Sequence, residues 1–139
     1  MRRVVIDTNC LLAILPSKSP YHVVWTDFIE GKLEICLSNE IIMEYEEILS
    51  EKTSSFFADA IIKSILNRKN IVRVSPTWRF KLITQDPDDN KFVDCAITGQ
   101  AEFLVSNDKH FAVLNEITFP AVKVINIKDF TEYDGKENG

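Results

Sequence analysis

The sequence predicts a single α/β domain whose sheet is largely parallel, with helices on both faces. Short β-branched runs alternate with amphipathic stretches of roughly 10 residues or more. Connections of that length carry the chain by a right-handed crossover to a parallel neighbour. The length of 139 residues, 45% of them hydrophobic, suffices for one core. We expect the domain to span residues 1–133 and the polar residues 134–139 to form a disordered tail.

The N-terminal part is predicted to run strand, loop, helix, strand. Residues 2–7, RRVVID, are a β-branched run that ends in an acid, which predicts the first strand. Pro16 and Pro20 break the segment that follows, so we expect a loop there. Apolar residues at helical spacing predict a helix over residues 21–30, and residues 33–37 form the second strand.

Two helices are predicted next, followed by a third strand. Ser38 or Asn39 can cap a helix over EIIMEYEEIL, residues 40–49. The helical period returns over residues 56–67, and NIVRVS, residues 70–75, reads as the third strand.

The C-terminal part adds one helix and two strands. The polar turn TQDPDDN, residues 84–90, starts a helix that we expect to continue through Ala101. EFLVS, residues 102–106, predicts the fourth strand, and AVKVINI, residues 121–127, the fifth.

Composition excludes several classes of protein. A net charge of -5 and a pI near 5.0 argue against a broad basic surface for nucleic acid, although a bound divalent cation would invert the sign of a local acidic cluster. No apolar run is long enough for a membrane span or has the form of a signal peptide, so we expect a cytoplasmic protein. Cys10, Cys36 and Cys95 lie singly in apolar segments and are expected to be buried thiols.

Two acids end predicted strands. Asp7 closes the first strand, and Asp108 stands just after FLVSN on the fourth. The carboxyl ends of parallel strands share one sheet edge, where open α/β folds bind ligands. Each acid alone also has a structural explanation, since Asp7 can cap a following helix and Asp108 can belong to a surface turn.

A third candidate acid lies on the helix over residues 40–49. At about 100° per residue, Glu44 and Glu46 fall on the two borders of its apolar face, and Glu47 points away. A border glutamate can reach a cleft, but it is more often solvated. Helical geometry leaves the choice between Glu44 and Glu46 open.

The segment DPDDNKFVDCA is the most acidic stretch. Asp89 falls in the buried stripe, one turn before Phe92 and Val93, and an acid there must be capped, paired or metal-bound. Asp94 lies nearly opposite that stripe, which favours a solvated role, and Asp88 can cap the helix.

With VVIDTN, EIIMEY, DPDDNKFVDCA and FLVSNDKHF in this order, the chain resembles PIN-domain ribonucleases over residues 4–130. It is most similar to the VapC-like toxins of toxin–antitoxin systems. The resemblance implies a Rossmann-like sheet of about five parallel strands and an acidic site that binds Mg²⁺ or Mn²⁺ and hydrolyses single-stranded or structured RNA. It also implies a cognate antitoxin protein and a homodimer.

The resemblance assigns residues to the site. Its four acids fall on Asp7, Glu44, Asp89 and Asp108, with Asn9 and Ser106 in support. A gap shifted by one residue would instead put Asn90 at the third position, leaving Asp94 one helical turn later as the substitute ligand.

The expected chemistry is metal-dependent phosphodiester hydrolysis. Asp7, Asp89 and Asp108, with Asp94 as the alternative, would hold one or two Mg²⁺ or Mn²⁺ ions, because these hard cations prefer oxygen ligands. Glu44 would complete the site or orient the attacking water, and Lys91 and Lys109 would supply local positive charge for RNA. His110 is close enough in sequence to Asp108 to contact substrate.

Three other functions fit parts of the pattern. A phospho-acceptor signalling domain needs an aspartate ending the central strand, and NIVRVS has none. A haloacid-dehalogenase-like phosphatase needs a second Asp where Asn9 stands. A PIN fold that has lost catalysis and acts as a binding module is the third.

Overall fold

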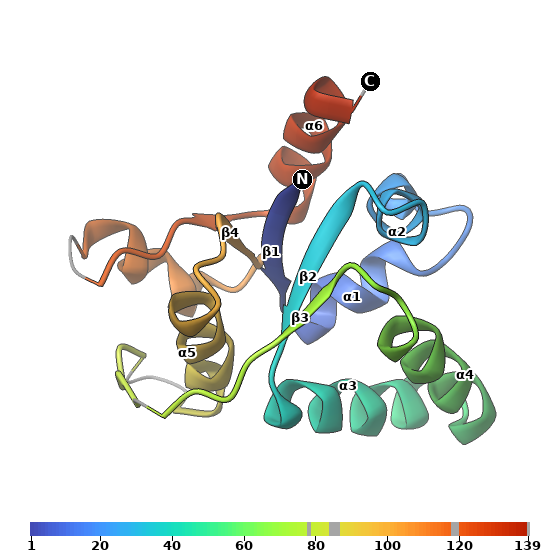
Figure 1. The fold of residues 1–139 in the computed structure, drawn as a ribbon, viewed down its shortest axis with the longest axis horizontal. Coiled ribbons are helices and arrows are strands. Elements are labelled where there is room, and N and C mark those ends of the chain that lie inside the picture. The colour runs from blue at the N-terminus through green and yellow to red at the C-terminus, as the bar shows by residue number, and fades with distance from the viewer. Residues whose placement is uncertain (78, 84–86, 118–119, 139) are drawn as a thin grey trace.

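Five parallel strands form one sheet in the order β3-β2-β1-β4-β5, as seen in the computed structural model (Figure 1). The structure describes residues 1–138 except 78, 84–86 and 118–119. The strands are β1 (Arg2–Ile6), β2 (Leu33–Leu37), β3 (Ile71–Arg73), β4 (Phe103–Val105) and β5 (Val124–Ile125). The predicted α/β class and five-stranded parallel sheet are confirmed.

Helices flank the sheet on both faces (Figure 1). They are α1 (Thr8–Ile14), α2 (His22–Ile29), α3 (Asn39–Lys52), α4 (Ser55–Leu66), α5 (Asn90–Thr98) and α6 (Ile127–Asn138), with 3₁₀ helices η1 (Pro87–Asp89) and η2 (Lys109–Glu116). Helix α5 packs on β1, β2 and β4, and α1 and α2 lie on the opposite side. Among the described residues, none of the helices could span a membrane.

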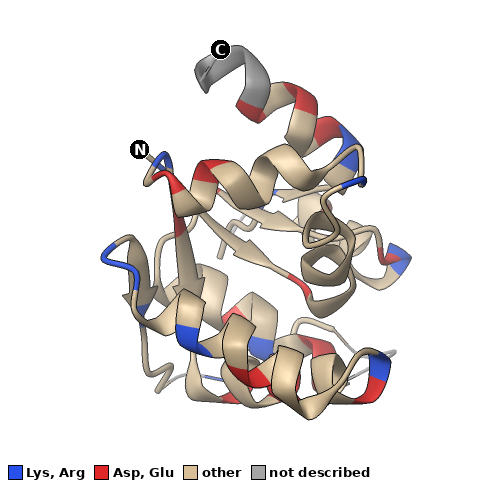
Figure 2. Cartoon of the chain, turned by 90° about the vertical axis from the view of Figure 1, so that its right-hand side faces the viewer, with Lys and Arg blue, Asp and Glu red and all other residues tan. Residues whose placement is uncertain are grey.

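The strands are apolar because both faces of the sheet are covered. Val4, Val5 and Ile6 of β1 are completely buried, as are Leu104 and Val105 of β4. Charged residues lie mainly on the outer sides of the helices and in the connections (Figure 2). All three cysteines are buried and free, as predicted.

Serine side chains fix where the two central helices begin. Ser38 accepts a hydrogen bond from the backbone N–H of Ile41 at 3.3 Å, and Ser54 accepts one from Phe57 at 3.0 Å. Of the two predicted caps of α3, the structure therefore uses Ser38, and Asn39 is the first helical residue.

Two helix boundaries differ from the prediction. The chain enters α1 immediately at Thr8, where we expected a loop, because the Asp7 carboxylate accepts the Cys10 N–H at 2.8 Å and caps the new helix. Helix α5 ends at Thr98 instead of Ala101, because Gly99 caps it and Gln100 adopts a left-handed φ of 54°.

The C-terminal residues also differ from the expected polar tail. Helix α6 continues through Asn138, and Asp134 within it is completely buried. Its carboxylate lies 3.1 Å from Arg2 Nη1 and is hydrogen-bonded to the Asp27 side chain of α2. Buried Phe130 anchors the same helix in the core. Phe130 and Asp134 therefore anchor helix α6 to the rest of the domain.

The buried Asp134 gives the protein a pH-dependent stability. Burial, followed by the hydrogen bond and negative charge of Asp27, raises the pKa of Asp134 to about 7, while Arg2 opposes the shift. The folded protein therefore holds a proton that the unfolded chain releases near pH 4. The free energy of unfolding should fall by on the order of 2 kcal/mol between pH 4 and pH 7 and change little above that range.

Asp134→Asn should remove most of this pH dependence, because the amide mimics the neutral acid and can donate to Asp27. Urea unfolding followed by circular dichroism at pH 5 and pH 8 measures the effect. Glu132→Gln, an exposed substitution on the same helix, serves as the control. An unchanged difference between the two pH values in Asp134→Asn would contradict the assignment.

Candidate active site

The two strand-terminal acids meet at the carboxyl edge of the sheet. β1 and β4 are neighbours, and the Asp7 N–H donates to the Val105 carbonyl at 3.0 Å. Ser106 joins the acids, because its hydroxyl donates to Asp7 Oδ2 and accepts the Asp108 N–H at 3.0 Å. The strand order thus brings together two acids that lie far apart in the sequence.

Asp7 is a buried carboxyl group, with only 6% of the residue exposed. Burial is the main cause of its raised pKa, and the charge of Asp108 adds to it, whereas hydrogen bonds from Ser106 and Cys10 partly compensate. A cation close to this carboxylate would stabilise its charged form.

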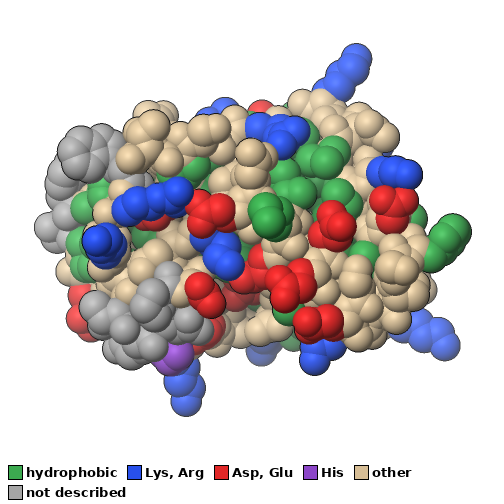
Figure 3. Space-filling view, turned by 90° about the horizontal axis from the view of Figure 1, so that it is seen from below, with side chains coloured by type: hydrophobic (Ala, Val, Ile, Leu, Met, Phe, Trp, Pro, Cys, Tyr) green, Lys and Arg blue, Asp and Glu red, His purple; other side chains and the backbone are tan. Residues whose placement is uncertain are grey.

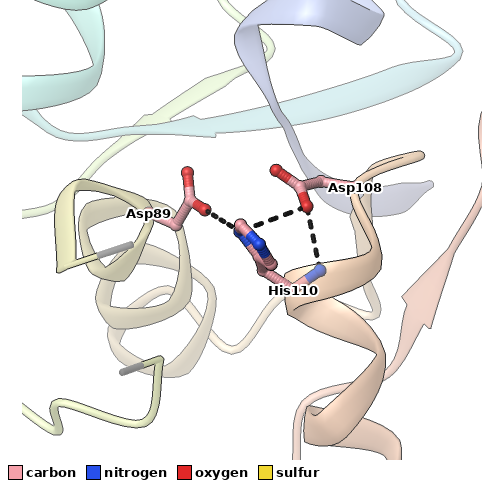
Figure 4. A group of neighbouring side chains, drawn as sticks. All are labelled: Asp89, Asp108 and His110. Atoms are coloured by element: carbon pink, nitrogen blue, oxygen red, sulfur yellow. Dashed lines mark hydrogen bonds and ion pairs between the residues drawn. The ribbon is translucent and has the colours of Figure 1, made fainter. Parts of the chain in front are cut away.

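Asp89, Asp108 and His110 bring their ligand atoms within 4.8 Å of one another. Figure 4 shows the imidazole between the two carboxylates, with Asp89 at the start of α5 and the other two residues at the start of η2. His110 Nδ1 lies 3.5 Å from Asp108 Oδ1 and 3.7 Å from Asp89 Oδ2. The His110 backbone N–H also donates to Asp108 Oδ1 at 2.9 Å, so the turn itself orients this carboxylate.

Glu44, and not Glu46, faces the site. Its carboxylate is bound by Lys91 Nζ at 2.6 Å and by the hydroxyl of Thr8, whereas Glu46 is exposed. The neighbouring Tyr45 donates its buried hydroxyl to the Ile6 carbonyl, which ties α3 to the end of β1. Helical geometry alone did not distinguish Glu44 from Glu46, and in the structure only Glu44 of the two contacts Thr8 and Lys91. The catalytic role of Glu44 stays a prediction.

Asp94 has a different environment from the one expected. It is 2% exposed, accepts the Phe80 N–H at 3.1 Å and lies 3.9 Å from Arg79 Nη1. Burial is also the main cause of its raised pKa. The prediction of a solvated Asp94 is wrong, because an irregular segment that includes Arg79 and Phe80 covers that side of α5.

The neighbouring polar residues have structural contacts. The Asn90 side chain accepts the Ile83 N–H and donates to the Ile83 carbonyl, both at 2.9 Å. Asn90 and Asp94 therefore both hold the segment that precedes the helix, and neither belongs to the Asp89, Asp108 and His110 group. Asn9 is exposed at the start of α1, and Asp88 is exposed in η1. The predicted turn at residues 84–86 lies outside the described residues.

His110 and Lys91 are the residues whose contacts the sequence did not show. The sequence places His110 near Asp108 in the chain, and the structure adds its contact with Asp89. The sequence predicts Lys91 as a local cation for RNA, and in the structure its ammonium group binds Glu44. The sequence shows Lys91 two residues after Asp89, but it does not show that Lys91 binds Glu44, which lies 47 positions away in the chain.

One face of the molecule carries a concentration of acidic side chains (Figure 3). Figure 3 views the side on which α3 lies in Figure 1, and Asp and Glu side chains gather across its middle with Lys and Arg among and around them. A cavity of about 560 Å³ opens next to Lys91 on this side of α5, and Arg79 and Lys81 also line it. Glu40, Asp88 and Asp94 line the same cavity, so acidic and basic side chains are equal in number among the described residues that line it.

Comparison with known proteins identifies the family and the fold. The family model described as PIN domain matches residues 3–110. No curated protein sequence matches the chain.

Several solved structures share the fold. The structure of VapBC2 from Rickettsia felis bound to a promoter DNA fragment contains a chain that is 19% identical, with a TM-score of 0.60 over 89% of this chain and 98% of that chain. A chain of DNA-bound VapBC from Salmonella typhimurium is 16% identical, with a TM-score of 0.55 over 91% and 99%. The PIN domain endonuclease Utp24 is 18% identical, with a TM-score of 0.52 over 89% and 84%. At these identities the structures establish a common fold, and the sequence match over most of the chain establishes that this protein belongs to the PIN domain family.

Proposed function

We propose that this protein is a metal-dependent endoribonuclease, with Asp7, Glu44, Asp89 and Asp108 as its acidic site. The observation that carries the proposal is the convergence of Asp89, Asp108 and His110, whose ligand atoms lie within 4.8 Å of one another. Asp7, held through Ser106 beside Asp108, adds a further carboxylate. Membership of the PIN family and the fold shared with the endonuclease Utp24 support hydrolysis of a phosphodiester bond.

The donor set fits Mn²⁺ or Mg²⁺. Two carboxylates and an imidazole offer the oxygen and nitrogen ligands that Mn²⁺ accepts, and Mg²⁺ would use the carboxylates with several waters. Asp89, Asp108 and His110 would hold the ion, and Asp7 would bind it directly or through water. A bound ion lowers the pKa of a coordinated water and neutralises charge that grows on the phosphate. Because Asp94 is buried against Phe80 and Arg79, we do not propose it as a ligand.

The protein's own groups would position the substrate. Asp7 is fixed by the Ser106 hydroxyl and the Cys10 N–H, so its carboxylate needs no rearrangement to orient a water. Three cations, Arg79, Lys81 and Lys91, line the cavity beside α5 together with three acids, Glu40, Asp88 and Asp94, and these cations would contact RNA phosphates.

The same fold occurs in complexes whose names pair a toxin with a second protein. Two of the similar structures are described as VapBC complexes and another as FitAB, all bound to DNA. We therefore propose that this protein is the toxin of such a pair, and that it forms a homodimer and acts in the cytoplasm. Induction of the gene alone should arrest growth, and coexpression of a small protein encoded next to it should relieve the arrest. Unaffected growth on induction would contradict the toxin assignment.

Metal binding and RNA cleavage measured together test the nuclease. In calorimetry the wild type should bind Mn²⁺, and it should cleave a mixed pool of RNA only when the metal is present. Asp108→Asn should lose both properties, whereas Asp59→Asn, which removes an exposed acid on α4, should retain them. The nuclease assignment fails if the wild type neither binds the ion nor cleaves. If it binds RNA and metal without cleaving, the fold acts as a binding module.

A further inference from the structure

The Glu44 corner of the site already contains a positive charge. Lys91 Nζ lies 2.6 Å from Glu44 Oε1, and the Thr8 hydroxyl donates to Glu44 Oε2. Both carboxylate oxygens of Glu44 therefore accept hydrogen bonds from protein groups. The Asp89, Asp108 and His110 group does not include Glu44.

The Lys91–Glu44 pair differs from the other lysine pairs in the described part of the chain. Its side chains are only 16% and 25% exposed, compared with 71% and 65% for Lys63–Asp59 and 48% and 57% for Lys32–Glu30. Exposed pairs are screened by water and contribute little, whereas a partly buried charge needs its partner. Removing Lys91 would leave the Glu44 carboxylate in need of another cation.

Rigid neighbours hold Lys91 in this position. It lies in the first turn of α5, where Asn90 makes two hydrogen bonds to Ile83 and Phe92 is buried. Its ammonium group is also 5.9 Å from the centre of the Phe92 ring. The lysine is therefore part of the same element that presents Asp89, two residues earlier.

We propose that the Lys91 ammonium group occupies the position of a second divalent cation beside Glu44, so that the site binds one metal ion instead of two. The ion would be held on the side of Asp89, Asp108 and His110, and Lys91 would be a fixed charge that meets the phosphate of the substrate. This inference rests on the metal site of the proposed function.

Counting bound Mn²⁺ without RNA tests the inference. Calorimetry and the loss of the free Mn²⁺ signal in electron paramagnetic resonance should give one ion per wild-type chain. Lys91→Met should bind two, and Lys91→Met combined with Glu44→Gln should return to one, because the second ion needs the Glu44 carboxylate. Lys91→Arg should retain one ion. Lys63→Met, which removes a lysine from an exposed pair far along the chain, should also retain one.

A second measurement does not depend on how well Lys91→Met folds. If Lys91 occupies the Glu44 corner, Glu44→Gln should change the Mn²⁺ affinity of the remaining site by less than about fivefold, and Asp108→Asn should weaken it by more than about 100-fold. Two ions in the wild type, one ion in a folded Lys91→Met variant, or equal losses in Glu44→Gln and Asp108→Asn would each overturn the inference while leaving the nuclease assignment intact. A wild type that binds no ion would overturn both.

Discussion

Asp7→Asn should reduce RNA cleavage by about 10³-fold or more, because it removes a carboxylate from the proposed metal site. The same substitution should also stabilise the folded protein at neutral pH, because burial raises the pKa of the Asp7 carboxyl. Asparagine caps a helix as well as aspartate does, so the hydrogen bond from Cys10 can remain, while the buried charge is lost. The variant would thus be inactive and more stable than the wild type.

The stabilisation should depend on pH in a defined direction. Burial raises the pKa of Asp7 in the folded protein, so the wild type loses stability as pH rises from the ordinary carboxyl range through the raised value. Asp7→Asn lacks that loss, and its advantage should be larger at pH 8 than at pH 4. Urea unfolding at both pH values and initial cleavage rates measure the two effects. A variant that is less stable than the wild type at pH 8 would contradict the predicted cost of the buried charge, and one that still cleaves would contradict the role of Asp7 in the site.

Asp89→Asn should abolish most RNA cleavage and Asp94→Asn should leave it nearly unchanged, although the two residues lie in one acidic segment. Asp89→Asn should reduce cleavage by about 10³-fold and weaken Mn²⁺ binding, because its carboxylate reaches toward His110 and Asp108. Asp94→Asn should leave the cleavage rate within about threefold, because Asp94 contacts the Phe80 backbone and Arg79 and lies outside that group.

Cleavage rates and Mn²⁺ isotherms for the two variants under the same conditions measure this difference. Asp88→Asn, an exposed substitution in η1, serves as the matched control for removing a charge from the same stretch. If Asp94→Asn lost activity and metal binding while Asp89→Asn retained them, the register shifted by one residue would be the correct one. The measurement therefore decides an assignment that the motif alone left between two residues.

The sequence predicted the sheet and two of its acids for a simple reason. Alternating short strands and helices require parallel crossovers, and an acid at the end of a parallel strand must lie at the carboxyl edge. The placement of Asp7 and Asp108 at this edge can therefore be predicted without knowing any side-chain contact. The position of Glu44 could not be predicted in this way. A helical wheel gives the direction of a side chain around the helix axis, but it does not show which neighbouring element the helix packs against.

The residues that the sequence misjudged depend on irregular segments or distant partners. The segment that covers Asp94 lacks a helical or alternating pattern, so its packing against α5 left no signal in the sequence. Helix α6 has a polar composition, and its order comes from the buried contacts of Phe130 and Asp134. The approach of His110 to Asp89 depends on how η2 leaves β4, which no spacing rule specifies.

The pairing of β1 with β4 also determines when the site forms during protein synthesis. Ser106 and Asp7 are hydrogen-bonded across 99 positions of the chain, and the ribosome completes β2, β3 and the helices between them first. A domain generally folds as a unit during synthesis, and long-range strand pairings are slow to form. A growing chain therefore carries Asp7 and Glu44 for most of its synthesis without Asp108 beside them. If the protein is a ribonuclease, as proposed, an unfinished chain could not cleave RNA near the ribosome, because its site is complete only after β4 has emerged.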